Sequence, residues 1–151
     1  MIFTLRNSSI KDVKFGKKVT VVDPVNLYGC KLGDNVFIGP FVEIQKNVII
    51  KKNSRIQSHS FICEKVNIGK NCFIGHGVMF INDKFQKGKP SGRNKIKMTI
   101  VGNNVSIGSN SSILPVSICS NVVIGAGSVV SKNITKSGVY TGNPARFVRK
   151  F

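Results

Sequence analysis

Acidic side chains are scarce in this sequence. Its 151 residues include 6 aspartates and glutamates against 23 lysines and arginines, so the formal net charge is +17. Such a balance favours an anionic ligand, although a surface that is simply rich in solvated lysine is the alternative. The known nucleic-acid-binding modules are absent. We therefore expect a small phosphorylated ligand and no nucleic acid.

Metal-binding and membrane-spanning patterns are also missing. There are two histidines, and the four cysteines lack the spacing of metal ligands, so we expect no metal and reduced structural thiols. No apolar run is long enough to span a bilayer, and residues 1–7 do not resemble a signal peptide. These absences predict a cytoplasmic protein without membrane insertion.

What the sequence does have is a strict six-residue period. A large apolar side chain recurs at every sixth position from Leu32 to Phe80, and an α-helix, with 3.6 residues per turn, would scatter these positions over all its faces. One short strand and one corner, repeated, explain the period. The sequence therefore predicts an all-β parallel β-helix with a coil of about 18 residues.

Interruptions of the period mark the remaining parts. The register slips by one residue near Leu27–Leu32 and again near Leu114–Pro115, and it is absent from residues 82–98. We expect 82–98 to be one long inserted functional loop. Residues 142–151, with Asn143 as an N-cap and Pro144 behind it, predict a short C-terminal helix that caps the last coil of a single domain, 1–151.

One corner of the predicted coils differs from the others. Corner positions mostly hold Asn, which tolerates left-handed backbone. The exception is a ladder of residues one coil apart: Phe41, His59, Gly77, Asn110 and Gly127. Because corner side chains project outward and histidine titrates near neutral pH, we expect His59 to be a general base. Its alternative role is that of a surface residue with a local hydrogen bond.

Four stretches resemble a known family. They are Ile56–Glu64 and Phe73–Asp83, together with Ile124–Val130 and Gly142–Ala145. They resemble the left-handed β-helix acyltransferases, and the first two are most similar to nucleotide-sugar N-acetyltransferases that act on dTDP-3-amino-3,6-dideoxyhexoses in surface polysaccharide synthesis. The resemblance implies acetyl-CoA as donor and a homotrimer with active sites between subunits.

The resemblance implies roles for further residues. Glu43 and Glu64 are predicted to orient the imidazole or to bind sugar hydroxyls, with a solvated charge as the alternative; we assign Glu64 to catalysis beside His59. Expected nucleotide-sugar contacts are the following: Phe41, Glu43, His76, Asn82, Asp83 and Arg93. Expected coenzyme A contacts are the following: Asn110, Gly125, Ala126, Gly127, Lys132 and Arg146.

Other functions fit the same repeats. An O-acetyltransferase for a small hydroxylated acceptor would share the fold, the histidine and the donor. A binding scaffold without enzymatic activity would have no affinity for acetyl-CoA. A zinc site like that of γ-carbonic anhydrases would need three histidines, and two per chain cannot easily supply them.

Overall fold

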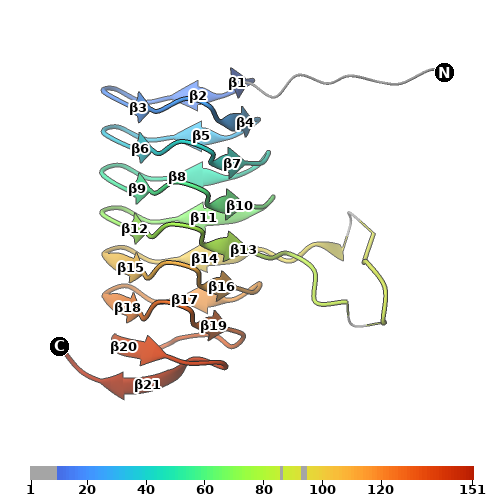
Figure 1. The fold of residues 1–151 in the computed structure, drawn as a ribbon, viewed down its shortest axis with the longest axis vertical. Coiled ribbons are helices and arrows are strands. Elements are labelled where there is room, and N and C mark those ends of the chain that lie inside the picture. Colours follow the sequence, from blue (N-terminus) through green and yellow to red (C-terminus); the bar gives the residue numbers. More distant parts are fainter. Residues whose placement is uncertain (1–9, 86, 93–94) are drawn as a thin grey trace.

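The chain is a parallel β-helix, as the six-residue period predicted, and it is left-handed, as the family resemblance implied. The computed structural model describes residues 10–85, 87–92 and 95–151. Their coils stack from β1 at one end to the β20–β21 hairpin at the other, and one loop projects sideways between β13 and β14 (Figure 1). No α-helix occurs in these described ranges, so the all-β class is confirmed.

Each coil gives one short strand to each of three sheets. Sheet A comprises β1 (Ile10–Lys11), β4 (Asn26–Tyr28), β7 (Glu43–Ile44), β10 (Phe61–Ile62), β13 (Met79–Phe80), β16 (Ser112–Ile113) and β19 (Val129–Val130). Sheet B comprises β2 (Lys14–Phe15), β5 (Lys31–Leu32), β8 (Ile49–Ile50), β11 (Val66–Ile68), β14 (Thr99–Val101) and β17 (Ser117–Ile118). Sheet C comprises β3 (Thr20–Val21), β6 (Phe37–Ile38), β9 (Arg55–Ile56), β12 (Phe73–Ile74), β15 (Val105–Ile107), β18 (Val122–Ile124), β20 (Gly138–Thr141) and β21 (Arg146–Arg149).

Strand pairing confirms the coil length and its slips. Ile56 pairs with Ile74, one 18-residue coil later, in the strict part of the repeat. Leu27 pairs with Ile44 and Ile107 with Ile124, so the coils that contain the two register slips are one residue shorter. Removing one residue at a corner keeps the inward side chains in register, because the change is absorbed where no strand pairing is required.

A single column of aliphatic side chains fills the coils. The repeat positions from Leu32 to Phe80 are at most 3% exposed. Buried serines lie between them and are satisfied internally: Ser54 and Ser60 donate hydrogen bonds of 2.8 Å to the carbonyls of Gly69 and Gly75. Thr99 is the exception in the described part of the chain, because its buried hydroxyl has no partner.

Asparagines build the corner between sheets B and C. Asn35, Asn53, Asn71, Asn104 and Asn121 all have a positive φ between 55° and 60°. Their side chains form a continuous ladder, in which each Nδ2 donates to the Oδ1 of the next asparagine at 3.0–3.1 Å. The predicted corner role of Asn is therefore confirmed, and the amides also join successive coils.

The predicted C-terminal helix is wrong. Residues 138–141 instead form β20, which pairs with β18 in parallel, and β21 folds back antiparallel on β20. The amide of Ala145 donates to Val129 O at 2.8 Å, and Gly142 O accepts from Val129 N at 2.9 Å. The last coil offers unpaired backbone groups, and the tail satisfies them as a strand better than a short helix would.

Two further predictions concerned the cysteines and membrane-spanning segments, and the structure bears on both within the described ranges. All four cysteines are free thiols, and Cys30, Cys63 and Cys72 are buried. Within residues 10–85, 87–92 and 95–151, no helix has the length and hydropathy needed to cross a membrane.

Candidate active site

The corner between sheets C and A carries the exposed histidine. We call it the His59 corner and define it by Phe41, His59, Gly77, Asn110 and Gly127, whose φ values lie between 59° and 68°. Backbone hydrogen bonds stack the corner residues: His59 N donates to Pro40 O, and Gly77 N donates to Ser58 O. The ladder that the sequence predicted is therefore present.

Phe41 holds the imidazole of His59. The two rings stack with their centroids 4.8 Å apart and their planes at 16°. Both side chains are exposed, and Phe41 retains 57% of its accessible surface. Stacking uses the ring faces and leaves the two ring nitrogens at the edge, so His59 can receive or deliver a proton toward solvent or a ligand.

Gly77 directly follows His59 in the ladder and carries no side chain. A Cβ atom at Gly77 would lie 2.5 Å from Asn110 Oδ1, so the side-chain amide of Asn110 occupies the space beside the glycine. The corner therefore presents an imidazole and an amide on either side of bare backbone. The imidazole supplies the base that an acyl transfer needs, whereas the Asn110 atom beside Gly77 is the acceptor Oδ1.

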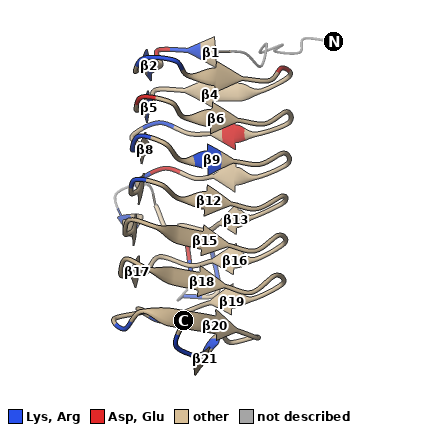
Figure 2. Ribbon diagram, turned by 90° about the vertical axis from the view of Figure 1, so that its left-hand side faces the viewer, with Lys and Arg blue, Asp and Glu red and all other residues tan. Residues whose placement is uncertain are grey.

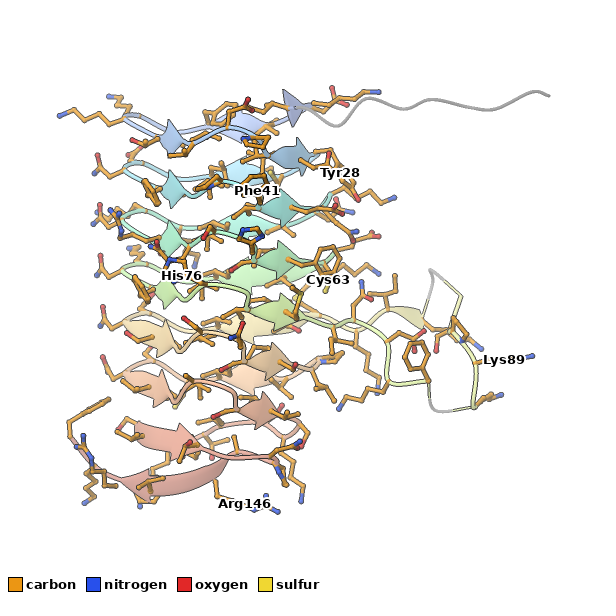
Figure 3. All side chains as sticks on the ribbon, viewed as in Figure 1. Tyr28, Phe41, Cys63, His76, Lys89 and Arg146 are labelled. Carbon is orange, nitrogen blue, oxygen red and sulfur yellow. The ribbon has the colours of Figure 1, made fainter. Side chains whose placement is uncertain are left out.

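The two histidines lie on the same region of the coil stack. His76 precedes Gly77, is exposed, and donates its backbone N–H to Ser109 Oγ at 3.2 Å. Its carbonyl accepts from Asn110 N at 2.9 Å. Figure 3 shows Phe41 and His76 on the coil body, far from Lys89 on the projecting loop.

Glu43 and Glu64 are occupied elsewhere. The carboxylate of Glu43, on β7, accepts 3.1 Å hydrogen bonds from Asn26 Nδ2 and Gln45 Nε2. Glu64 lies beyond β10, at the next corner, where its Oε1 accepts from Asn47 Nδ2 at 3.1 Å. Strand β10 separates Glu64 from His59, so the expectation that Glu64 orients this imidazole is not supported within one chain.

The sequence interpretation missed the amides that hold these carboxylates. Gln45 donates to Glu43 and accepts the Glu64 backbone N–H at 3.1 Å, so it connects the two glutamates. A signal was present in the sequence, because Asn26 and Glu43 occupy equivalent outward positions in neighbouring coils. A carboxylate that accepts hydrogen bonds from neighbouring amide side chains is held in one position, whereas a solvated carboxylate is not.

Asp83 organises the base of the inserted loop. Its carboxylate accepts from the backbone N–H of Phe85 at 2.9 Å, from Ser91 Oγ at 3.0 Å and from Ser91 N. The N–H groups of Phe85 and Ser91 favour the charged form and lower the pKa of Asp83. Asn82 lies beside it, half-buried. Arg93, also predicted to contact substrate, lies outside the described residues.

The expected coenzyme A contacts are only partly brought together. Gly125, Ala126 and Gly127 follow β18 at the His59 corner, and no atom lies within 4 Å of a Cβ built on Gly127. Arg146 is near them, because it pairs with Thr141, whose Oγ1 lies 2.8 Å from a Cβ built on Gly125. Lys132 follows β19 at a different corner.

Comparison with known proteins agrees with the repeat. Residues 29–64 match a model described as bacterial transferase hexapeptide (six repeats). Residues 65–79 and 98–132 match the hexapeptide repeat of succinyl-transferase. The chain is 44% identical over 107 residues to the bifunctional protein GlmU of Wigglesworthia glossinidia brevipalpis, and 39% identical over 132 residues to GlmU of Clostridioides difficile (strain 630). These alignments cover 70% and 86% of the chain but only 21% and 27% of the two relatives.

Solved structures share the fold at low identity. AntD, an N-acyltransferase from Bacillus cereus crystallised as a point mutant with dTDP and coenzyme A, superposes with a TM-score of 0.81 at 22% identity, covering 91% of this chain and 83% of AntD. PerB from Caulobacter crescentus, in complex with coenzyme A and GDP-perosamine, gives 0.68 at 19% identity, covering 94% and 58%. The chain belongs to the hexapeptide-repeat transferases of the left-handed β-helix fold.

Proposed function

We propose that this chain is an acetyl-CoA-dependent N-acetyltransferase that acts on the amino group of a nucleotide-linked amino-deoxy sugar. The observation that carries the proposal is the His59 corner, where an exposed imidazole stacks on Phe41 and bare backbone follows one coil later at Gly77. The similarity to AntD and PerB, both crystallised with coenzyme A and a nucleotide or nucleotide sugar, supports it.

The reaction needs one proton to be moved and one oxyanion to be stabilised. When the neutral amine attacks the thioester carbonyl, the resulting ammonium must lose a proton, and we assign its uptake to the imidazole of His59. We assign the developing oxyanion to Nδ2 of Asn110, which requires the amide to turn, because Oδ1 is the atom beside Gly77. The thiolate of coenzyme A then leaves and takes up a proton.

Donor and acceptor are proposed to approach from opposite ends of the His59 corner. The bare backbone at Gly125–Gly127 allows the pantetheine arm to come close, and Arg146 is available for a phosphate. Phe41, at the other end, would contact the acceptor. A dTDP-linked 3-amino-3,6-dideoxyhexose is the acceptor class that we propose, with surface polysaccharide synthesis as its use.

A homotrimer with sites between subunits is part of the proposal. Phe73 and Met79, each 41% exposed, lie on either side of His76 and Gly77 in the same coil. Large apolar side chains exposed beside a site favour a protein partner over open solvent. Light scattering should give three times the mass of the chain; a monomeric mass would contradict this part.

Transfer to amines is the direct test. Purified protein with acetyl-CoA and a panel of nucleotide-linked amino sugars should release free coenzyme A thiol. Release with alcohol acceptors only would instead identify an O-acetyltransferase. If calorimetry shows no affinity for coenzyme A, the chain is a binding scaffold.

His59→Asn is the sharpest variant. Asn occupies equivalent corners elsewhere with the same positive φ, so the backbone should be kept while the base is lost. We expect kcat to fall by about 10²-fold or more. His76→Asn is the matched control: because His76 is an expected substrate contact, its loss should act on KM and leave kcat close to that of the wild type. Equal kcat of His59→Asn and the wild type would contradict the assignment.

A further inference from the structure

Sheet B carries a positively charged groove that the proposed reaction does not use. Its lining includes five lysines from four successive coils: Lys14, Lys31, Lys51, Lys52 and Lys70. The groove has a volume of about 400 Å³ and is shallow. Its one acidic residue is Asp34, whose Oδ1 already accepts the backbone N–H of Lys17.

The groove lies away from the candidate active site of the same chain. The His59 corner joins sheets C and A, so in a three-sided coil it is the corner opposite sheet B. Figure 2 shows lysine and arginine positions gathered along the edge that holds β2, β5 and β8. Glu43 and Glu64, by contrast, lie on or beside sheet A.

The inserted loop adds positive charge at the other edge of sheet B. It leaves sheet A after β13 and returns into sheet B at β14, so it borders the same face. Lys65 Nζ donates to Ile96 O at 3.5 Å, which ties the returning segment to the coil. A hollow of about 490 Å³ in the loop is lined by four more lysines: Lys87, Lys89, Lys95 and Lys97.

Exposed aliphatic side chains lie among the lysines. Register places Ile49 beside Lys31 on the outer face of sheet B, and Ile100 is an outward residue two coils further on. They are 37% and 45% exposed, and Met98, which enters β14, is 51% exposed. Phe15, which is 47% exposed, also lines the groove. Exposed aliphatic and phenylalanine side chains enter the boundary between lipid headgroups and acyl chains, and lysines beside them pair with anionic headgroups.

We propose that the sheet B face, with the adjoining loop, docks on an anionic lipid bilayer. The lysines would lie at the level of the lipid phosphates, with their stems along the apolar surface, while Ile49 and Ile100 contact the acyl boundary. The face therefore supplies a reason for the excess positive charge that an enzyme site alone does not need.

Vesicle co-sedimentation tests the proposal. The wild type should bind vesicles of phosphatidylcholine with 30–40% phosphatidylglycerol, roughly the mix used to mimic an anionic leaflet, and not vesicles of phosphatidylcholine alone. Lys14→Gln with Lys31→Gln should weaken binding about 25-fold, since each lysine contributes about fivefold. Lys136→Gln with Lys150→Gln removes the same net charge from the C-terminal end and should change binding by less than about threefold.

The apolar component needs its own variant. Ile49→Asn with Ile100→Asn should also weaken binding to anionic vesicles, while leaving binding to a DNA oligonucleotide unchanged. Equal losses in the two lysine pairs would show that only net charge matters and would overturn the proposal. So would a preference for DNA over vesicles in competition, which would identify nucleic acid as the occupant.

Discussion

At the scale of single residues, Thr99 is the least satisfied position in the core. Its side chain is 1% exposed, and its hydroxyl has no hydrogen-bond partner in the described part of the chain. Its register partner is Val66. Because a buried hydroxyl without a partner costs about 1–3 kcal/mol, Thr99→Val should raise the free energy of unfolding by about 1 kcal/mol, measured by urea denaturation. Ser54→Val, which removes a paired hydroxyl, is the contrasting control and should not stabilise.

Substitutions at Asn53 can distinguish the contribution of backbone strain to stability from that of the side-chain hydrogen bonds. Its φ is 60°, and its amide both donates and accepts in the Asn ladder. Asn53→Ala loses both features, whereas Asn53→Gly loses the hydrogen bonds but tolerates the left-handed backbone. We expect Asn53→Ala to be the more destabilising by about 1 kcal/mol in thermal or urea unfolding. Equal losses would mean that the hydrogen bonds alone matter at this corner.

At the scale of elements, Asp83 should control the order of the inserted loop. Asp83→Ala removes the acceptor for Phe85 N, Ser91 N and Ser91 Oγ. Trypsin should then cleave near Lys84–Lys89 severalfold faster, while the unfolding midpoint of the coils stays unchanged, because the loop lies outside the core. A variant with unchanged cleavage would show that the Asp83 contacts do not hold the loop.

The same carboxylate gives the loop a pH dependence. The pKa of Asp83 is lowered, so its contribution is present at neutral pH and is lost as the pH falls below the usual aspartate range through the folded pKa. Hydrogen exchange of the Ser91 amide, corrected for the intrinsic rate, should show protection at pH 6 that weakens toward pH 3. Asp83→Asn should show little of this change.

The elements also show what a sequence pattern can predict. The burial of Leu32 and Ile38 could be predicted from the period alone, because every sixth residue must face the same narrow core. The strand in the tail at Gly142–Arg149 could not be predicted in this way. Its N-cap residue and proline express a local preference for a helix, whereas the unpaired edge of the last coil, on which the strand forms, is a tertiary feature. The hydrogen bonds of Glu64 to Asn47 and Gln45 were not predicted for a related reason, since they depend on which residues neighbouring coils bring to the same corner.

At the scale of the whole molecule, the thiols buried in the core make the free energy of unfolding sensitive to alkaline pH. Burial raises the pKa of Cys30 to about 11 and that of Cys63 to about 12, and it also raises the pKa of Cys72. In the unfolded chain these thiols ionise near pH 9, so above this pH the unfolded state binds fewer protons than the folded state. Stability from this source is therefore complete below about pH 9 and falls as the pH rises toward 11.

Cys30→Val tests this coupling along the coil stack. Cys30 occupies the inward hexad position that Val36 and Val42 hold in the following two hexads and that Val48 holds in the next coil, so valine should fit without loss of packing. The urea midpoint of the wild type should fall between pH 8 and pH 10.5, and the fall should be smaller in Cys30→Val, because one of the thiols that resist ionisation is gone. Lysine titration affects both proteins equally, so identical slopes would show that the Cys30 thiol does not contribute to the alkaline loss of stability.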